Sequence, residues 1–149
     1  MKCNNSYQNS EDSKMQEALL ATKLEESGYH QAVVIWWDKS FKAFDVIGIK
    51  PNWDIKTFEL KHTNSEWTFY IFTHWLDKLV WLTTTSADYW VVMTPTKFHF
   101  FNTQDLKELL NENNLPFKQN IWIHWKNRWY LIWDKLYKPL ILKTINYEN

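Results

Sequence analysis

Glycine is almost absent from this chain of 149 residues, which contains only Gly28 and Gly48. Glycine-rich phosphate loops, collagen-like segments and flexible glycine linkers are therefore excluded as the basis of its function. The single cysteine, Cys3, leaves no internal disulfide and no thiolate metal site, which favours an intracellular setting. No run reaches the roughly 18 apolar residues of a membrane span, and the N-terminus lacks the apolar segment of a signal peptide. We expect a cytoplasmic protein without membrane contacts.

The chain also lacks an excess of charge, because 17 Lys and Arg side chains balance 17 Asp and Glu side chains. This balance is unusual for proteins that grip phosphate backbones, which often carry a basic surface. The distribution is uneven, however, since residues 116–149 carry six basic and only two acidic side chains. We expect contacts with nucleic acid phosphates to come from this part of the chain, notably from Lys126 and Arg128.

Tryptophan, in contrast, is abundant, with 11 residues, several of which stand in alternating runs. Aromatic side chains can stack on the bases of unpaired nucleic acid. They are also favoured in strands and supply much of the buried surface of a small core. We favour the second interpretation for most of them.

The length predicts one domain with a single core. Residues 1–13 are polar and aperiodic, so we expect a flexible N-terminal tail followed by a single domain over residues 14–149. The spacing of Leu20 and Leu24 predicts a helix over residues 14–27. A similar spacing of leucines predicts a second helix over residues 103–111.

Strands are predicted where polar and apolar residues alternate or where β-branched and aromatic residues gather. They fall at residues 31–37, 41–49, 55–62, 66–73, 90–93 and 97–101, in a hairpin of residues 121–125 and 129–133, and in a last apolar stretch at 139–145. Residues 126–128 are the predicted turn of this hairpin. Residues 87–89 are a predicted helical turn, and residues 75–82 fit a strand and a short helix equally well.

Two acids and a lysine lie in two consecutive predicted strands. Alternation over residues 55–62 sends Glu59 and Lys61 to one face and their apolar neighbours to the other. Thirteen residues separate Asp45 from Glu59, enough for a strand to end, turn and return beside itself. A pair of carboxylates can hold a hard cation such as Mg²⁺ or Mn²⁺, while a nearby lysine positions water or stabilises charge on a phosphate.

Each of these residues also has a purely structural interpretation. Asp45 can be a strand-end acid held by a backbone amide or by Lys42. Glu59 and Lys61 can form an exposed charge pair, which would contribute only a few tenths of a kcal/mol. We favour the metal site because Asp45 stands among apolar residues and would otherwise lose its hydration without an obvious partner.

The segment Phe44-Asp45, followed by Glu59-Leu60-Lys61, resembles the PD-(D/E)XK superfamily of restriction-endonuclease-like nucleases, although phenylalanine stands where a proline often precedes the acid. Residues 84–92 and 100–110 resemble small phage-type members. The resemblance implies an α/β fold with an αβββαβ core, a mixed central sheet and, here, a C-terminal β-hairpin addition. It further implies metal binding by Asp45, Glu59 and the carbonyl of Leu60, with Glu17 of the first helix as an additional catalytic carboxylate.

The expected activity is hydrolysis of phosphodiester bonds with Mg²⁺ or Mn²⁺, on DNA more readily than RNA. The resemblance suggests a viral or mobile-element origin and action in the host cell cytoplasm, and cleavage of both strands of a duplex would call for a homodimer. The alternative is a catalytically inactive nuclease-fold module that contacts nucleic acid or a host defence protein. A structural virion protein is a third hypothesis. Asp88 is predicted to cap the turn at residues 84–86 rather than bind metal.

Overall fold

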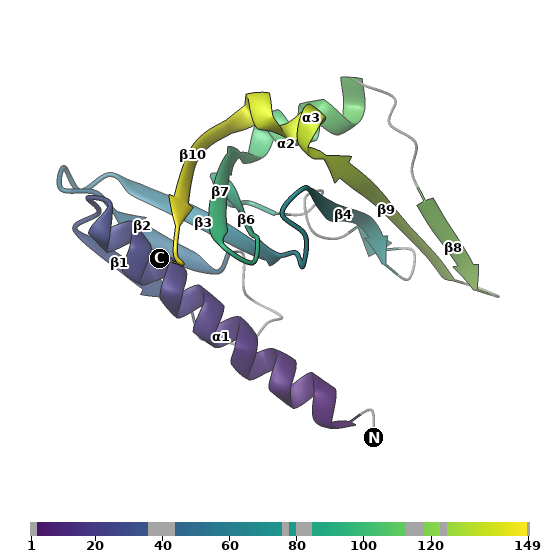
Figure 1. Ribbon diagram of the computed structural model, residues 1–149, viewed down its shortest axis with the longest axis horizontal. Helices are drawn as coiled ribbons and strands as arrows, with labels where there is room; N and C mark the ends of the chain where they lie inside the picture. Colours follow the sequence, from purple (N-terminus) through teal and green to yellow (C-terminus); the bar gives the residue numbers. More distant parts are fainter. Residues whose placement is uncertain are drawn as a thin grey trace.

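The computed structural model has an α/β architecture with one mixed β-sheet, a second smaller sheet and a long N-terminal helix (Figure 1). It describes residues 3–35, 44–75, 78–79, 85–112, 118–122 and 125–148. Within these ranges, the side chains of residues 12–35, 44–71, 85–111 and 129–148 are described. Among the helices in the described ranges, none has the length and apolar character needed to cross a lipid bilayer.

The larger sheet contains six strands in the spatial order β1-β2-β3-β6-β7-β10. These strands are β1 (Gln31–Val34), β2 (Val46–Ile49), β3 (Ile55–His62), β6 (Tyr89–Met93), β7 (Lys97–Asn102) and β10 (Ile141–Asn146). Neighbouring strands run antiparallel, except that β3 and β6 are parallel. A parallel pair requires a crossover connection, and here the crossover carries the first strands of the second sheet.

The smaller sheet has the order β5-β4-β9-β8 and extends away from the larger one (Figure 1). Its strands are β4 (Thr68–Trp75), β5 (Lys78–Leu79), β8 (Lys118–Trp122) and β9 (Trp125–Trp133). The strands β4 and β9 pair over six registered positions from Thr68↔Trp133 to His74↔Arg128. The predicted C-terminal hairpin is therefore present as β8 and β9, but it joins β4 and β5 rather than standing alone.

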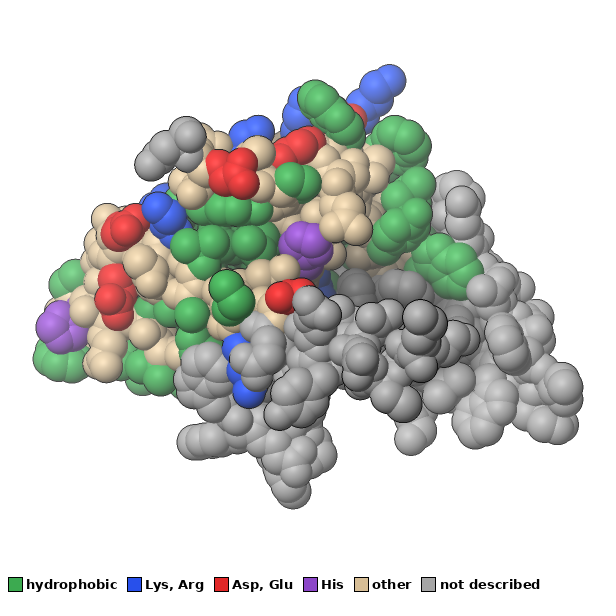
Figure 2. All heavy atoms as spheres, turned by 60° about the horizontal axis from the view of Figure 1, so that its bottom comes forward, with side chains coloured by type: hydrophobic (Ala, Val, Ile, Leu, Met, Phe, Trp, Pro, Cys, Tyr) green, Lys and Arg blue, Asp and Glu red, His purple; other side chains and the backbone are tan. Residues whose placement is uncertain are grey.

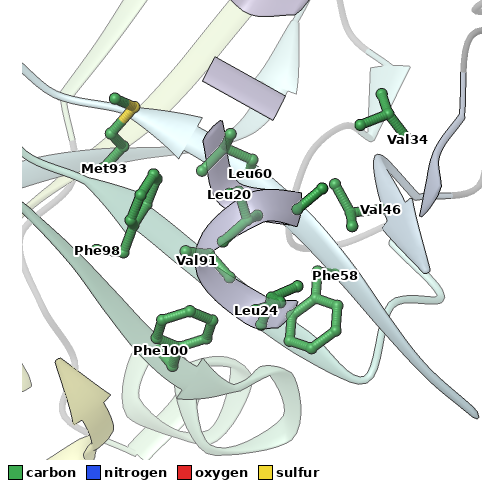
Figure 3. Packing of buried hydrophobic residues seen from close by; sticks show 11 residues of the cluster. Leu20, Leu24, Val34, Val46, Phe58, Leu60, Val91, Met93, Phe98 and Phe100 are labelled. Carbon is green, nitrogen blue, oxygen red and sulfur yellow. The ribbon is translucent and has the colours of Figure 1, made fainter. Parts of the chain in front are cut away.

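The helix α1 (Cys3–Glu26) covers one face of the larger sheet (Figures 1 and 3). Leu20 and Leu24, separated by one helical turn, are buried against this face, where strand alternation presents apolar side chains. The core they complete contains Val34, Val46, Phe58, Leu60, Val91, Met93, Phe98 and Phe100. Figure 3 shows Leu20 beside Leu60 and Leu24 beside Phe58. This core is thus built from α1 and residues of five strands.

A second core fills the opposite face of the larger sheet. It contains Phe69, Ile71, Trp90, Val92, Phe101, Leu106, Leu109, Ile132 and Tyr137. The residues come from β4, β6, β7, β9 and two helices, α2 (Thr103–Glu112) and α3 (Asp134–Tyr137), with a 3-10 turn over Lys138–Leu140 leading into β10. Two clusters of buried residues, one on each face of the larger sheet, therefore stand in place of the single core expected from length.

Several predicted elements are confirmed closely, namely the strands at 55–62 and 90–93 and the helix at 103–111. The N-terminal prediction differs, because α1 begins at Cys3, inside the segment expected as a flexible tail. No glycine or proline interrupts residues 3–26, so nothing in the backbone stops the helix. The strands predicted at 31–37 and 41–49 are shorter in the structure, and residues 36–43 lie outside the described ranges.

Two predicted turns are wrong. Residues 126–128 lie within β9, since Trp122 pairs with Trp125 and Asn120 with Asn127. Trp125, Trp129 and Trp133 are each four residues apart, so in a continuous strand all three project from the same face. Residues 87–89 form no helical turn, because Asp88 is drawn to β3 and the strand β6 begins at Tyr89. In the described part of the β3–β6 connection there is also no helix, which an αβββαβ core would place there.

Candidate active site

Asp45 lies immediately before β2, and its backbone is fixed between two strands. Its N–H donates to the carbonyl of Phe58 at 2.9 Å, and its carbonyl accepts from the N–H of Ile35 at 2.9 Å. The side chain is buried, and Oδ2 accepts a hydrogen bond from the N–H of Leu60 at 2.7 Å. A carboxylate thus takes the place of a strand neighbour for β3 where β2 has not yet begun. The Leu60 N–H is thus the kind of backbone amide partner that the structural interpretation of Asp45 requires, and the same hydrogen bond fixes the position of the carboxylate.

Glu59 and Lys61 project from β3 on the face opposite to Phe58 and Leu60. Lys61 Nζ lies 3.0 Å from Glu59 Oε1, and the two side chains are 24% and 16% exposed. Lys61 Nζ also lies 5.8 Å from the ring centroid of Trp90, within range of a cation–π interaction. The Lys61 ammonium therefore lies over the Trp90 ring and beside the Glu59 carboxylate, and it is partly accessible to solvent.

Trp90 belongs to the site because of the parallel pairing of β3 with β6, which places it beside Glu59. The start of this pairing is locked by a reciprocal contact between Thr57 and Asp88. Asp88 Oδ2 accepts from the Thr57 N–H at 2.9 Å and from Thr57 Oγ1 at 3.1 Å, and Thr57 Oγ1 accepts from the Asp88 N–H at 2.9 Å. Asp88 therefore has a structural role, as expected, and its partner in the described part of the chain is Thr57 of β3; Thr84 of the turn that it is predicted to cap lies outside the described residues.

The start of β2 holds Asp45 beside the strand that carries Glu59. The registered pairs of β2 and β3 end at Val46↔Phe58, and the Asp45 N–H still donates to the Phe58 carbonyl. The Leu60 N–H points to Asp45, and because a strand residue presents its N–H and C=O on the same side, the Leu60 carbonyl opens toward the same edge.

These donors suit a magnesium ion. Mg²⁺ is typically bound through one or two carboxylates and keeps several waters, and it requires oxygen ligands. Asp45, Glu59 and the Leu60 carbonyl supply oxygen ligands, and a carboxylate has acceptor sites beyond those used by one N–H or one ammonium. Among the described residues no group of three or more His, Cys, Asp and Glu side chains gathers as a metal cage.

Glu17 is buried on the packed side of α1, one turn before Leu20. This helix covers the face of Phe58 and Leu60, whereas Glu59 and Lys61 lie on the other face. Participation of Glu17 in the site stays a prediction. Its burial sets Glu17 apart from a glutamate on the solvated surface of a helix.

The expected phosphate contacts lie elsewhere in the molecule. Lys126 and Arg128 are residues of β9, paired with Ile121 and Gln119 of β8, and their side chains fall outside the described ranges. Figure 2 shows acidic and basic side chains interspersed over the described part of one face, with apolar groups between them. Over that area, no single-sign patch marks a phosphate track.

Sequence reasoning missed Trp90 and Thr57 as parts of the site. Both follow from the parallel pairing of strands whose partners stand 31 residues apart, as in Glu59↔Trp90. No local pattern announces such a pairing. The one available signal is the alternating segment after residue 62. It predicts a further strand between β3 and β6, and a connection of this length allows the two to pair in parallel.

Compared with protein-family models, with curated proteins and with solved structures, the chain matches none of them.

Proposed function

We propose that this protein is a divalent-metal-dependent nuclease of the PD-(D/E)XK type that hydrolyses phosphodiester bonds, with DNA as the preferred substrate. The observation that carries the proposal is the hydrogen bond from the Leu60 N–H to the Asp45 carboxylate, which keeps this acid beside the strand that carries the Glu59–Lys61 pair. In the larger sheet, α1 is followed by three antiparallel strands and then by β6, which runs parallel to β3, and this order supports the same assignment. A viral or mobile-element origin, action in a host cytoplasm and a homodimer for duplex cleavage belong to the proposal.

Asp45, Glu59 and the Leu60 carbonyl would hold the Mg²⁺ or Mn²⁺ ion. The ion supplies Lewis-acid polarisation of the phosphate and a water of lowered pKa. Lys61 cannot act as a base while it is an ammonium beside Glu59, so its role is to orient the attacking water and to donate hydrogen bonds to the phosphate oxygens as charge grows there. Water adds to phosphorus, and one P–O ester bond breaks to leave a hydroxyl end and a phosphate end.

Two features assist Lys61 in this role. The indole of Trp90 is fully buried and limits where the ammonium can lie, which reduces the freedom lost when a substrate binds. The Thr57–Asp88 contacts fix the strand on which Lys61 stands. Glu59 holds the ammonium before a phosphate arrives, so the positive charge is positioned in advance.

A specific observation favours the second candidate, an inactive binding module. The Asp45 carboxylate accepts a backbone N–H at 2.7 Å and Glu59 pairs with Lys61 at 3.0 Å, so the main acidic groups have partners within the protein itself. In that case the same residues stabilise the sheet, and nucleic acid or a host defence protein binds without turnover.

The test is incubation of the purified protein with labelled single- and double-stranded DNA and RNA, each with Mg²⁺, Mn²⁺ or a chelator. We expect cleavage of DNA that requires metal and is lost in the Glu59→Gln variant. Lys56→Met serves as a control. Lys56 lies on β3 like Glu59, but its ion pair at 3.5 Å is with Asp54, away from the candidate site. Absence of cleavage with either metal, or full activity of Glu59→Gln, would favour the binding module.

A further inference from the structure

A pocket lies on the same face of the larger sheet as Glu59 and Lys61. Its volume is about 420 Å³, and its walls include Glu66, Trp67, His99, Tyr137, Lys138 and Thr144. Pockets of a few hundred Å³ with a few placed polar groups are the usual size of small-ligand sites. The residues come from the loop before β4, from β7, from α3 and the turn after it, and from β10.

Trp67 forms an exposed wall of this pocket, with 63% of its surface accessible. Its loop is fixed by hydrogen bonds, because Ser65 Oγ accepts from the N–H groups of Trp67 at 3.1 Å and Thr68 at 3.2 Å. Thr63 Oγ1 in turn donates to the carbonyl of Thr68 at 2.9 Å. An indole carried on an ordered loop is a platform for stacking that needs little further ordering on binding.

Polar groups line the opposite side of the pocket. His99 is only 9% exposed, and its Nδ1 lies 2.9 Å from Thr144 Oγ1. Burial, with a smaller contribution from Lys97, lowers the pKa of His99 against the opposing effect of Glu66, so the imidazole is neutral at pH 7. A neutral imidazole and a hydroxyl can both donate and accept, which suits the mixed edges of a nucleobase.

The charges around the pocket nearly cancel. Lys97 lies 3.9 Å from Glu66, and Lys138 lies 3.3 Å from Asp134. Recognition in this pocket would therefore depend on stacking and hydrogen bonds more than on attraction to phosphate. This balance fits a base better than a free polyphosphate.

The pocket is aligned with the candidate active site. Strand registers place Lys61 opposite Val92, Val92 opposite His99, and His99 opposite Thr144, in one row across four strands. Because neighbouring strands lie about 4.8 Å apart, the backbones of Lys61 and His99 are about 10 Å apart. Val92, between them in this row, is buried in the second core, so a strand of nucleic acid with a phosphate at Lys61 would reach the pocket around the edge of that core.

We propose that this pocket holds one unpaired base of a single nucleic acid strand, stacked on Trp67 and hydrogen-bonded by the His99 and Thr144 wall. The inference rests on the proposed action on nucleic acid, but it concerns binding and does not require turnover. It assigns a preference for single-stranded or locally opened substrate, because a paired base cannot enter a pocket in this way.

The test is fluorescence anisotropy of a labelled single-stranded DNA oligonucleotide in EDTA, where no metal-dependent cleavage occurs. Trp67→Ala should weaken binding at least about fivefold, since one stacked base contributes that much or more. Trp53→Ala is the matched control: Trp53 is 72% exposed, near the start of β3, and its loss should change affinity less than about twofold. Thr144→Val should weaken binding about twofold to tenfold by removing one hydrogen-bonding group from the pocket wall.

Unchanged affinity of Trp67→Ala, or no binding of the oligonucleotide by the wild type, would overturn the proposal. An equal loss in Trp53→Ala would do the same, because it would mark general aromatic adhesion. Displacement of the oligonucleotide by dTMP at matched concentration would overturn the assignment to a strand in favour of free nucleotides. If cleavage occurs but Trp67→Ala binds normally, the nuclease stands and the pocket assignment fails; if Trp67→Ala weakens binding and no metal supports cleavage, the reverse holds.

Discussion

Replacement of Asp45 separates its structural role from its proposed metal-binding role. Asp45→Ala removes the acceptor of the Leu60 N–H, a group that lies in the buried part of β3. An unsatisfied buried donor costs about 1–3 kcal/mol, so the free energy of unfolding should fall by about that amount. Asp45→Asn keeps an oxygen that can accept the same N–H and loses only the charge-assisted part, about 1 kcal/mol.

The two variants respond differently to metal if Asp45 is a ligand. A metal that binds only the folded protein stabilises it by about 2.7 kcal/mol at a hundredfold excess over its dissociation constant. Urea unfolding in EDTA and in Mg²⁺ should therefore show a metal-dependent gain for the wild type and little gain for Asp45→Asn. An equal gain in both proteins would refute the ligand role. A stability loss in Asp45→Ala with no metal effect in the wild type would leave Asp45 as a purely structural acid.

Three further predictions test the framework around the site. Thr57→Val removes a hydroxyl that both donates to and accepts from Asp88, and should lower the free energy of unfolding by about 1–3 kcal/mol in urea titrations, unlike Thr22→Val on the exposed surface of α1. Gly48→Ala places a Cβ 2.7 Å from the Tyr29 ring and should cost about 1–3 kcal/mol, with Gly48→Ser no better; wild-type stability of the alanine variant would show that the ring moves aside freely. Burial lowers the pKa of His99, so as the pH falls the unfolded state takes up the proton before the folded state does. The contribution of His99 to the free energy of unfolding should therefore be full above about pH 6.5 and decrease below it. Urea titrations between about pH 7.5 and 5.5 should show this decrease in the wild type and not in His99→Asn.

The parts of the fold that local pattern determines could be predicted from the sequence. The strand at Ile55–His62 follows from strict alternation, which also gave the shared face of Glu59 and Lys61 that their 3.0 Å contact bears out. The helix at Thr103–Glu112 follows from its leucine spacing. Patterns of this kind depend on neighbours within a few residues, so a single chain contains them in full.

Long-range pairing could not be predicted in the same way. The parallel register of β3 and β6 brings Trp90 under Lys61, and the second sheet joins β4 to β9 across some 60 residues of chain. The sequence predicts a hairpin turn at residues 126–128, whereas these residues lie inside β9 and pair with β8. In each case packing against a distant partner overrides the local composition.

The most direct test of the central claim is the division of roles between Glu59 and Lys61. Lys61→Met keeps the apolar stem over Trp90 but removes the ammonium, and Glu59→Gln keeps the shape but removes the charge. Both side chains are partly exposed, and ion pairs of this kind are worth at most about 1 kcal/mol, so both variants should fold.

Mg²⁺ affinity by calorimetry and DNA cleavage should be measured on the same preparations of both variants and the wild type. We predict that Glu59→Gln loses metal binding and cleavage together, whereas Lys61→Met binds Mg²⁺ like the wild type yet cleaves about a hundredfold more slowly or worse. Wild-type cleavage by Lys61→Met, or unchanged Mg²⁺ affinity in Glu59→Gln, would contradict the account.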